Sequence, residues 1–114
     1  MSLQGKVWGS TELLLNRGNV EVQRLEIKKN GYCSKHKHNA KYNMFYVEEG
    51  SLQIEVWKND YDLCDITTLK KGQSTIIPPR EYHKFTALKD CTVYEIYWVE
   101  LETHDIERED CGGM

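Results

Sequence analysis

The sequence lacks several features, and each absence excludes a class of protein. No apolar run approaches the ~20 residues that a membrane-spanning helix needs, and the N-terminus has no basic and then apolar signal peptide. The net charge is −3, so the chain lacks the excess of lysine and arginine that binds nucleic acid. No window has a convincing helical period of apolar residues. These absences predict a cytoplasmic protein built from strands that binds neither nucleic acid nor membranes.

The sequence also has no CxxC pair, although it contains four cysteines. Cys33, Cys64, Cys91 and Cys111 lie far apart, and no export signal accompanies them. We therefore predict reduced thiols. Cys33 is near His36 in the sequence, but a small, half-buried side chain is its expected role rather than that of a soft metal ligand.

A length of 114 residues suits one domain and leaves no room for a second core. Hydrophobic residues make up 39% of the chain and charged residues 29%, which is typical of a globular protein and excludes a disordered one. We predict a single domain over residues 1–102, followed by an acidic tail over residues 103–114. His104, in that tail, is expected to face solvent.

Short stretches with a period of two, separated by turn residues, predict an all-β sandwich or barrel. A short strand and a turn are expected before residue 20, and a bulge near Gln23 and Arg24 would bring the two halves of the next strand into phase. The last strand is apolar on both faces, which is typical of a buried strand. The expected strands cover residues 20–29, 42–47, 52–57, 63–69, 74–77, 82–88 and 92–101.

Two histidines, His36 and His38, lie one residue apart within the stretch 31–50. In an extended chain, side chains at i and i+2 share a face, so two imidazoles can bind one cation. The alternative is a solvated basic loop, since Lys35 and Lys37 flank them. His83 favours the first interpretation, because strand parity places it on the inward face and three histidines on one small β domain serve no packing need.

These residues resemble the two sequence motifs of the cupins. The first cupin motif is a glycine, a His-x-His pair, a glutamate and a glycine, and those places hold Gly31, His36, His38, Asn43 and Gly50. The second is similar to Gly72, Pro78 and His83, with Arg80 in place of a glycine and Ala87 in place of an asparagine. The resemblance implies a double-stranded β-helix, a jelly-roll barrel of short antiparallel strands.

A narrower similarity covers nearly the whole chain. Residues 7–10, 72–78 and 105–110 resemble the cupin domain of type II mannose-6-phosphate isomerases, which often forms the C-terminal part of mannose-1-phosphate guanylyltransferases. No nucleotidyltransferase domain is present here, so only the isomerase part applies. By this resemblance His36, His38 and His83 bind the metal, Asn43 occupies the place of the metal-binding glutamate, and Lys41 that of an arginine.

The two replacements change the expected chemistry. Three neutral imidazoles, with at most a weak oxygen from Asn43, leave the full charge on a divalent zinc, manganese, iron or nickel ion, which makes it a stronger Lewis acid. Lys41 offers a point charge to a phosphate instead of a planar fork. We predict that Lys41, Arg80 and Tyr82 contact the substrate.

An isomerase also needs a base close to its substrate. Tyr42, Tyr46 and Tyr82 lie near the site in sequence, but strand tyrosines mostly pack. Glu48 and Glu95 would serve if their strands turned them inward, but glutamates in antiparallel strands mostly face water. The sequence therefore leaves the catalytic residues unassigned.

Three functions remain open. The first is a metal-binding cupin that acts on a small sugar or sugar phosphate, as an isomerase. The others are a three-histidine iron oxygenase and a non-catalytic carbohydrate-binding or sensing protein. The family resemblance implies a homodimer, because small barrels with exposed edge strands benefit from covering them.

Overall fold

The computed structural model describes residues 2–58 and 63–99, so the predicted acidic tail lies outside the described residues. Nine strands fill most of this length. They are β1 (Ser2–Lys6), β2 (Gly9–Arg17), β3 (Val20–Ile27), β4 (Tyr42–Glu49), β5 (Ser51–Trp57), β6 (Cys64–Lys70), β7 (Ser74–Ile77), β8 (Tyr82–Ala87) and β9 (Cys91–Trp98).

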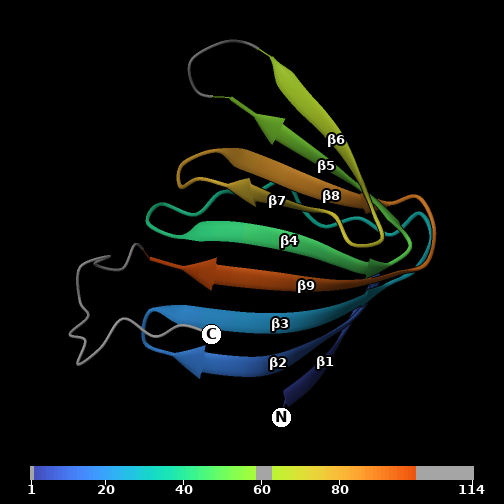
Figure 1. Cartoon of the computed structure of the whole chain (residues 1–114), viewed down its shortest axis with the longest axis horizontal. Helices are drawn as coiled ribbons and strands as arrows, with labels where there is room; N and C mark the ends of the chain where they lie inside the picture. The colour runs from blue at the N-terminus through green and yellow to red at the C-terminus, as the bar shows by residue number, and fades with distance from the viewer. Residues whose placement is uncertain (1, 59–62, 100–114) are drawn as a thin grey trace, which may run out of the picture.

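The strands form two antiparallel sheets (Figure 1). The larger sheet has the order β1-β2-β3-β9-β4-β7, and the smaller has the order β6-β5-β8. The described residues contain no helix, so none of them forms a helix of the length and apolar character that could cross a membrane. The predicted all-β jelly-roll fold is confirmed.

The inward-facing side chains change from apolar to polar along the large sheet. Residues paired across strands share a face, so rows can be followed from β3 across β9 to β4. The row at what we call the closed end is Leu25, Val93 and Val47; the next is Gln23, Glu95 and Phe45; the last, at the open end, is Glu21, Tyr97 and Asn43. The closed end is the hydrophobic core, where each fully buried aliphatic side chain contributes roughly 1.5–3 kcal/mol. The open end is polar.

Two local predictions were wrong. The turn before residue 20 is preceded by a hairpin of two strands, because Val7 and Trp8 form a turn between β1 and β2. The bulge lies in β2, between Leu13 and Leu15, and not in β3. β3 itself continues unbroken between β2 and β9, so Val22 faces outward and Leu25 faces the core, and the change of phase in its sequence reflects the polar inward positions Glu21 and Gln23.

Gly50 joins β4 to β5 in a conformation that other residues rarely adopt. Its φ is +101°, and a Cβ added there would lie 2.3 Å from the backbone oxygen of Asp90. We expect Gly50→Ala to lower the free energy of unfolding by at least about 2 kcal/mol. Gly5→Ala is the control, since nothing lies within 4 Å of its added Cβ. Equal urea midpoints for the two variants would contradict this prediction.

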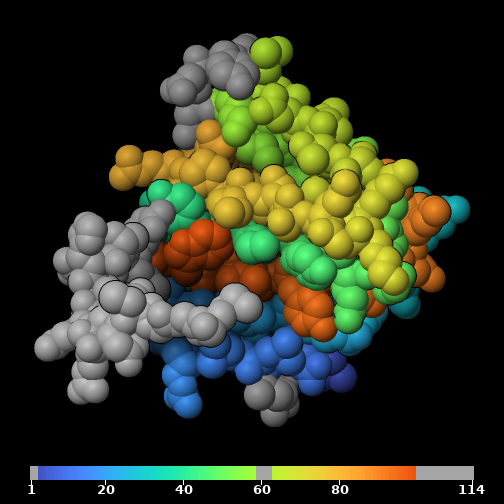
Figure 2. Space-filling model, viewed as in Figure 1, coloured from blue at the N-terminus to red at the C-terminus, as the bar shows by residue number. Residues whose placement is uncertain are grey.

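The outer face of the large sheet carries a continuous apolar row. Cross-strand pairs connect Leu15, Val22, Ile96, Met44 and Ile76. Leu15 is 40% exposed and Ile76 is 54% exposed. Figure 2 shows side chains of β4, β7 and β9 side by side at the surface. The apolar outer positions of β9, from which we predicted a buried strand, are thus half-buried on this face.

Candidate metal centre

His36 and His38 lie in the loop between β3 and β4, outside any strand. We expected both histidines to lie in an extended strand, but only His36 pairs with a strand, through an isolated bridge to His83 on β8. His36 and His83 exchange two backbone hydrogen bonds, of 3.1 and 2.8 Å, which fasten the loop to β8. Arg80 donates its backbone N–H to the carbonyl of His38 at 2.6 Å. The loop is therefore held at two points beside His83.

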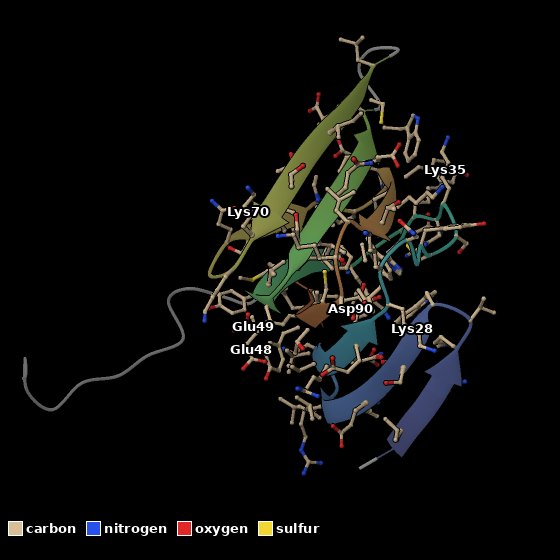
Figure 3. All side chains as sticks on the ribbon, turned by 90° about the vertical axis from the view of Figure 1, so that its right-hand side faces the viewer. Lys28, Lys35, Glu48, Glu49, Lys70 and Asp90 are labelled. Atoms are coloured by element: carbon tan, nitrogen blue, oxygen red, sulfur yellow. The ribbon has the colours of Figure 1, made fainter. Side chains whose placement is uncertain are left out.

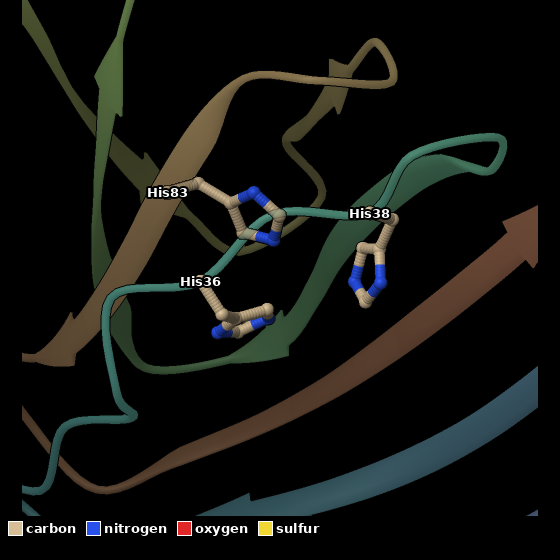
Figure 4. Close-up of side chains that lie close together, drawn as sticks. All are labelled: His36, His38 and His83. Carbon is tan, nitrogen blue, oxygen red and sulfur yellow. The ribbon is translucent and has the colours of Figure 1, made fainter.

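The three imidazoles converge at the open end of the barrel. The ring centroids of His36 and His83 are 4.5 Å apart, and those of His38 lie 5.2 and 5.5 Å from them. One ligand nitrogen from each ring lies within 4.8 Å of the other two. Figure 4 shows His36 and His38 reaching the group from the loop and His83 reaching it from β8.

In both His36 and His83, a hydrogen bond engages Nδ1 and leaves Nε2 free to bind a metal. His36 Nδ1 is 2.7 Å from the carbonyl oxygen of Ser34, and His83 Nδ1 is 3.1 Å from that of Glu81. A ligating histidine usually donates its second N–H to such a carbonyl, which fixes the tautomer. Nε2 of His38 and of His83 is buried without a hydrogen-bond partner among the described residues. A buried, unpaired nitrogen is costly, and a bound cation would satisfy it.

Burial favours the neutral form of His38 and His83. It lowers the pKa of His83 to about 4, although the hydrogen bond to Glu81 opposes the shift. The pKa of His38 is also lowered, first by burial and then by the nearby charges of His36 and Lys41. A neutral imidazole is the form that binds metal ions, so His38 and His83 need lose no proton to do so at neutral pH.

A cavity of about 300 Å³ adjoins His36, which forms part of its wall together with Glu95 and Tyr97. A larger hollow of about 550 Å³ lies at the closed end, where Figure 3 shows Glu49, Asp90 and Lys28. Its acidic side chains are already engaged, Glu49 by Lys71 and Asp90 by the backbone of Lys29. The smaller cavity is therefore the candidate site.

Comparison with known proteins identifies the family of this chain. The family model described as "Cupin domain" matches residues 23–100. The chain belongs to the cupin family. Among curated proteins, this cupin is 27% identical over 92 residues to the 11S globulin seed storage protein G3 of Helianthus annuus, covering 81% of the chain. It spans only 18% of that relative's length.

Solved structures show the same fold. KdgF from Halomonas sp. superposes with a TM-score of 0.75 and 14% identity, over 90% of this cupin and 89% of KdgF. Oxalate decarboxylase from Bacillus subtilis, known for its Mn(II) centres, has a TM-score of 0.78 and 14% identity over 86% of this cupin and 27% of that chain. At these identities the likeness concerns the fold.

The side chain of Asn43 is hydrogen-bonded to a buried acid. It is buried in β4, and its Nδ2 donates a 3.0 Å hydrogen bond to Oε2 of Glu95 on β9. Tyr97, the cross-strand partner of Asn43, donates its hydroxyl to the same carboxylate. The predicted weak ligand is thus a hydrogen-bond partner of a buried acid.

Sequence reasoning placed Glu95 in water, and this was wrong. It is 7% exposed and faces the barrel interior, whereas Glu48 is exposed. Burial raises the pKa of Glu95 to about 7. The signal was present in the sequence, because Glu95 alternates in phase with Val93 and Tyr97, and side chains at i and i+2 of a strand share a face.

The three predicted substrate contacts lie in different places. Lys41 is exposed, with its Nζ 5.1 Å from the ring of Tyr97, near the open end of this cupin. Arg80 is also exposed and follows two prolines, with a φ of +72°. Tyr82 alternates with His83 and so lies on the outer face of β8, below Lys35 and Lys37. The structure thus brings Lys41 and Arg80 close to the histidine loop but turns Tyr82 away from the cavity.

Cys33 lines the cavity, and its sulfur accepts the backbone N–H of Phe85. Burial raises the pKa of its thiol to about 11, so it stays protonated at neutral pH. Cys33, Cys64 and Cys91 are free thiols, as predicted, and Cys111 lies outside the described residues.

Proposed function

We propose that this cupin is an enzyme that holds one divalent metal ion on His36, His38 and His83 and acts on a small sugar or sugar phosphate. The observation that carries the proposal is the convergence of three imidazole nitrogens within 4.8 Å beside a cavity of about 300 Å³. Asn43 stays a candidate for a weak fourth ligand, because its Nδ2 donates to Glu95 while its Oδ1 is buried without a hydrogen-bond partner among the described residues.

A divalent ion on three neutral ligands would supply Lewis-acid chemistry with its full charge. The protein contributes the rest. The carbonyl groups of Ser34 and Glu81 orient two of the rings, and the loop bridge to β8 holds His36 against His83. Manganese is one candidate, since the fold is shared with a protein that has Mn(II) centres. Zinc, iron and nickel also suit imidazole ligands.

Sugar-phosphate isomerisation is the reaction that the motif resemblance favours. Such a reaction moves a proton between neighbouring carbons and requires a base near the substrate. A buried carboxylate, that of Glu95, lies in the cavity wall, although the general preference of glutamate for water led us to place it in solvent. This carboxylate supports an isomerase, because it can supply the base that is otherwise missing where Asn43 replaces the family's glutamate.

Metal analysis tests the site. Protein purified without chelator should contain about one divalent ion per chain, and the double variant His36→Ala, His83→Ala should contain none. His104→Ala, which changes the remaining histidine, is the control. Wild-type protein without metal, or a double variant with undiminished metal, would contradict the assignment. Oxygen uptake with small acids or thiols would indicate an oxygenase instead, and sugar binding without turnover would indicate a carbohydrate-binding protein.

We further propose that the predicted homodimer forms through the apolar row on the outer face of the large sheet. We expect Ile76→Lys to convert the dimer to a monomer, because it places a charge at the exposed end of the apolar row, which the dimer would remove from water. Ile66→Lys is the control, since Ile66 is 62% exposed on β6 of the other sheet. Light scattering would overturn this proposal if the wild type is monomeric, or if only Ile66→Lys dissociates the dimer.

A further inference from the structure

Glu95 carries a carboxylate inside the barrel that the metal site does not use. It projects inward from β9 and lines the cavity together with His36 and Tyr97. Among the described residues, the side chains close enough to share one metal ion are three histidines, with no carboxylate. Glu95 therefore lies beside the candidate metal ion without being one of its ligands.

Two donors fix the orientation of this carboxylate. Asn43 donates from β4 at 3.0 Å, and Tyr97 donates its hydroxyl from two residues further along β9. A carboxylate has about four acceptor positions, so two donors leave room for a proton from a substrate. An aspartate or glutamate at position 43 would instead repel Glu95. The amide of Asn43 can therefore donate to an ionised Glu95 on β9, which an acid at position 43 could not do.

The surroundings of Glu95 suit proton transfer at neutral pH. Burial raises its pKa to about 7, and the negative charge of Glu21 on β3 acts in the same direction. The hydrogen bond from Tyr97 acts in the opposite direction. The other neighbours in its row, Gln23 and Phe45, are uncharged. A base is most effective when its pKa lies near the working pH.

The rest of the cavity wall indicates the class of substrate. Lys6 reaches it from β1 and supplies a positive charge, while Gln4, Thr11 and Ser34 supply amide and hydroxyl groups. A volume of about 300 Å³ is at the small end of the range for ligand sites. A small molecule with several hydroxyl groups and one anionic group matches this lining.

We propose that Glu95 is the catalytic base and moves a proton between adjacent carbons of a small polyhydroxylated anion. The carboxylate takes the proton from the carbon next to a carbonyl group, so that the C–H bond breaks, an O–H bond forms and the electron pair moves onto the carbonyl oxygen. Glu95 then returns the proton to the former carbonyl carbon, and a hydroxyl proton passes to the former carbonyl oxygen. No oxidant or reductant is needed. This inference rests on the proposed function, because the substrate has to lie between His36 and Glu95.

Hydrogen exchange into a sugar phosphate tests the role of Glu95. Protein loaded with Mn²⁺ is incubated with fructose 6-phosphate in D₂O, and deuterium at C1 is followed by proton NMR. We expect exchange by the wild type and a roughly 100- to 10,000-fold slower exchange by Glu95→Gln. The variant should keep the wild-type Mn²⁺ content and bind fructose 6-phosphate with unchanged affinity in calorimetry. Glu48→Gln, with its side chain in solvent, should behave as the wild type does.

The positioning residues give a second measurement. Since the hydrogen bond from Tyr97 lowers the pKa of Glu95, Tyr97→Phe should move the pH midpoint of exchange upward. Wild-type exchange rates in Glu95→Gln would overturn the role of Glu95. So would a Mn²⁺-loaded wild type that exchanges no deuterium into fructose 6-phosphate or ribulose 5-phosphate. Failure to bind Mn²⁺ at all would instead overturn the proposed function.

Discussion

Replacing Glu95 by glutamine should stabilise the metal-free protein by about 3 kcal/mol at pH 8 and leave its stability nearly unchanged at pH 4.5. The pKa of Glu95 is raised from 4.5 to about 7 in the folded state, so the folded protein favours the protonated acid. Its contribution to stability is complete below pH 4.5 and is lost as the pH rises to about 7. Glutamine resembles the protonated acid at every pH and therefore avoids this loss.

His83 has the opposite pH dependence. Its pKa is lowered to about 4, so its contribution is complete above the ordinary value of 6.5 and is lost as the pH falls toward 4. Between pH 6.5 and 4.5 the two residues partly cancel in the wild type. In Glu95→Gln the free energy of unfolding should therefore fall between pH 6.5 and pH 4.5, because only the loss due to His83 remains. Urea unfolding at several pH values, without metal, measures both effects, and Glu48→Gln is the control. Equal stabilities of wild type and Glu95→Gln at pH 8 would contradict the burial of this carboxylate.

Divalent metal should raise the free energy of unfolding by about 4 kcal/mol when its free concentration is 1,000 times the dissociation constant. The physical reason is that Nε2 of His38 and His83, buried without a hydrogen-bond partner among the described residues, gains one only when the ion binds. Thermal unfolding with Mn²⁺ or Zn²⁺, compared with unfolding in a chelator, measures this increment.

The double variant His36→Ala, His83→Ala should lose that increment and should melt at the same temperature with and without metal. His104→Ala should keep it. The same metal-dependent stabilisation in the double variant would show that the ion binds elsewhere, for example to thiols. This measurement needs no substrate and is therefore independent of which sugar the protein binds.

The convergence of His36, His38 and His83 could be predicted because its signals are short in range. His36 and His38 are one residue apart, and the parity of β8 sets the direction of His83. The Val7–Trp8 turn was missed because only Gly9, just after it, is a typical turn residue. The bulge could not be placed from β3, since the change of phase in that strand comes from an inward face that turns polar at Glu21 and Gln23 and not from an extra residue.

Glu95 and Lys6 illustrate a different difficulty. The strand phase of Glu95 was readable, but a general preference of glutamate for water outweighed it, because no signal in the sequence showed that Asn43 and Tyr97 would be its hydrogen-bond donors. Lys6 lines the cavity because β1 pairs with β2, whose Thr11 lines the same cavity. Such proximity depends on tertiary structure and has no local signature.

The change from apolar to polar rows along β3, β9 and β4 separates the folding core of this barrel from the residues around the proposed base. Backbone amides around Leu25, Val93 and Val47 should exchange with solvent most slowly, since opening there requires the whole core to unfold. In the open-end row, Asn43 and Tyr97 orient Glu95, so substitutions there would disturb the proposed base. A library confined to exposed residues of the cavity wall, namely Gln4, Lys6 and Ser34, would alter ligand preference while the folding core and Glu95 stay intact.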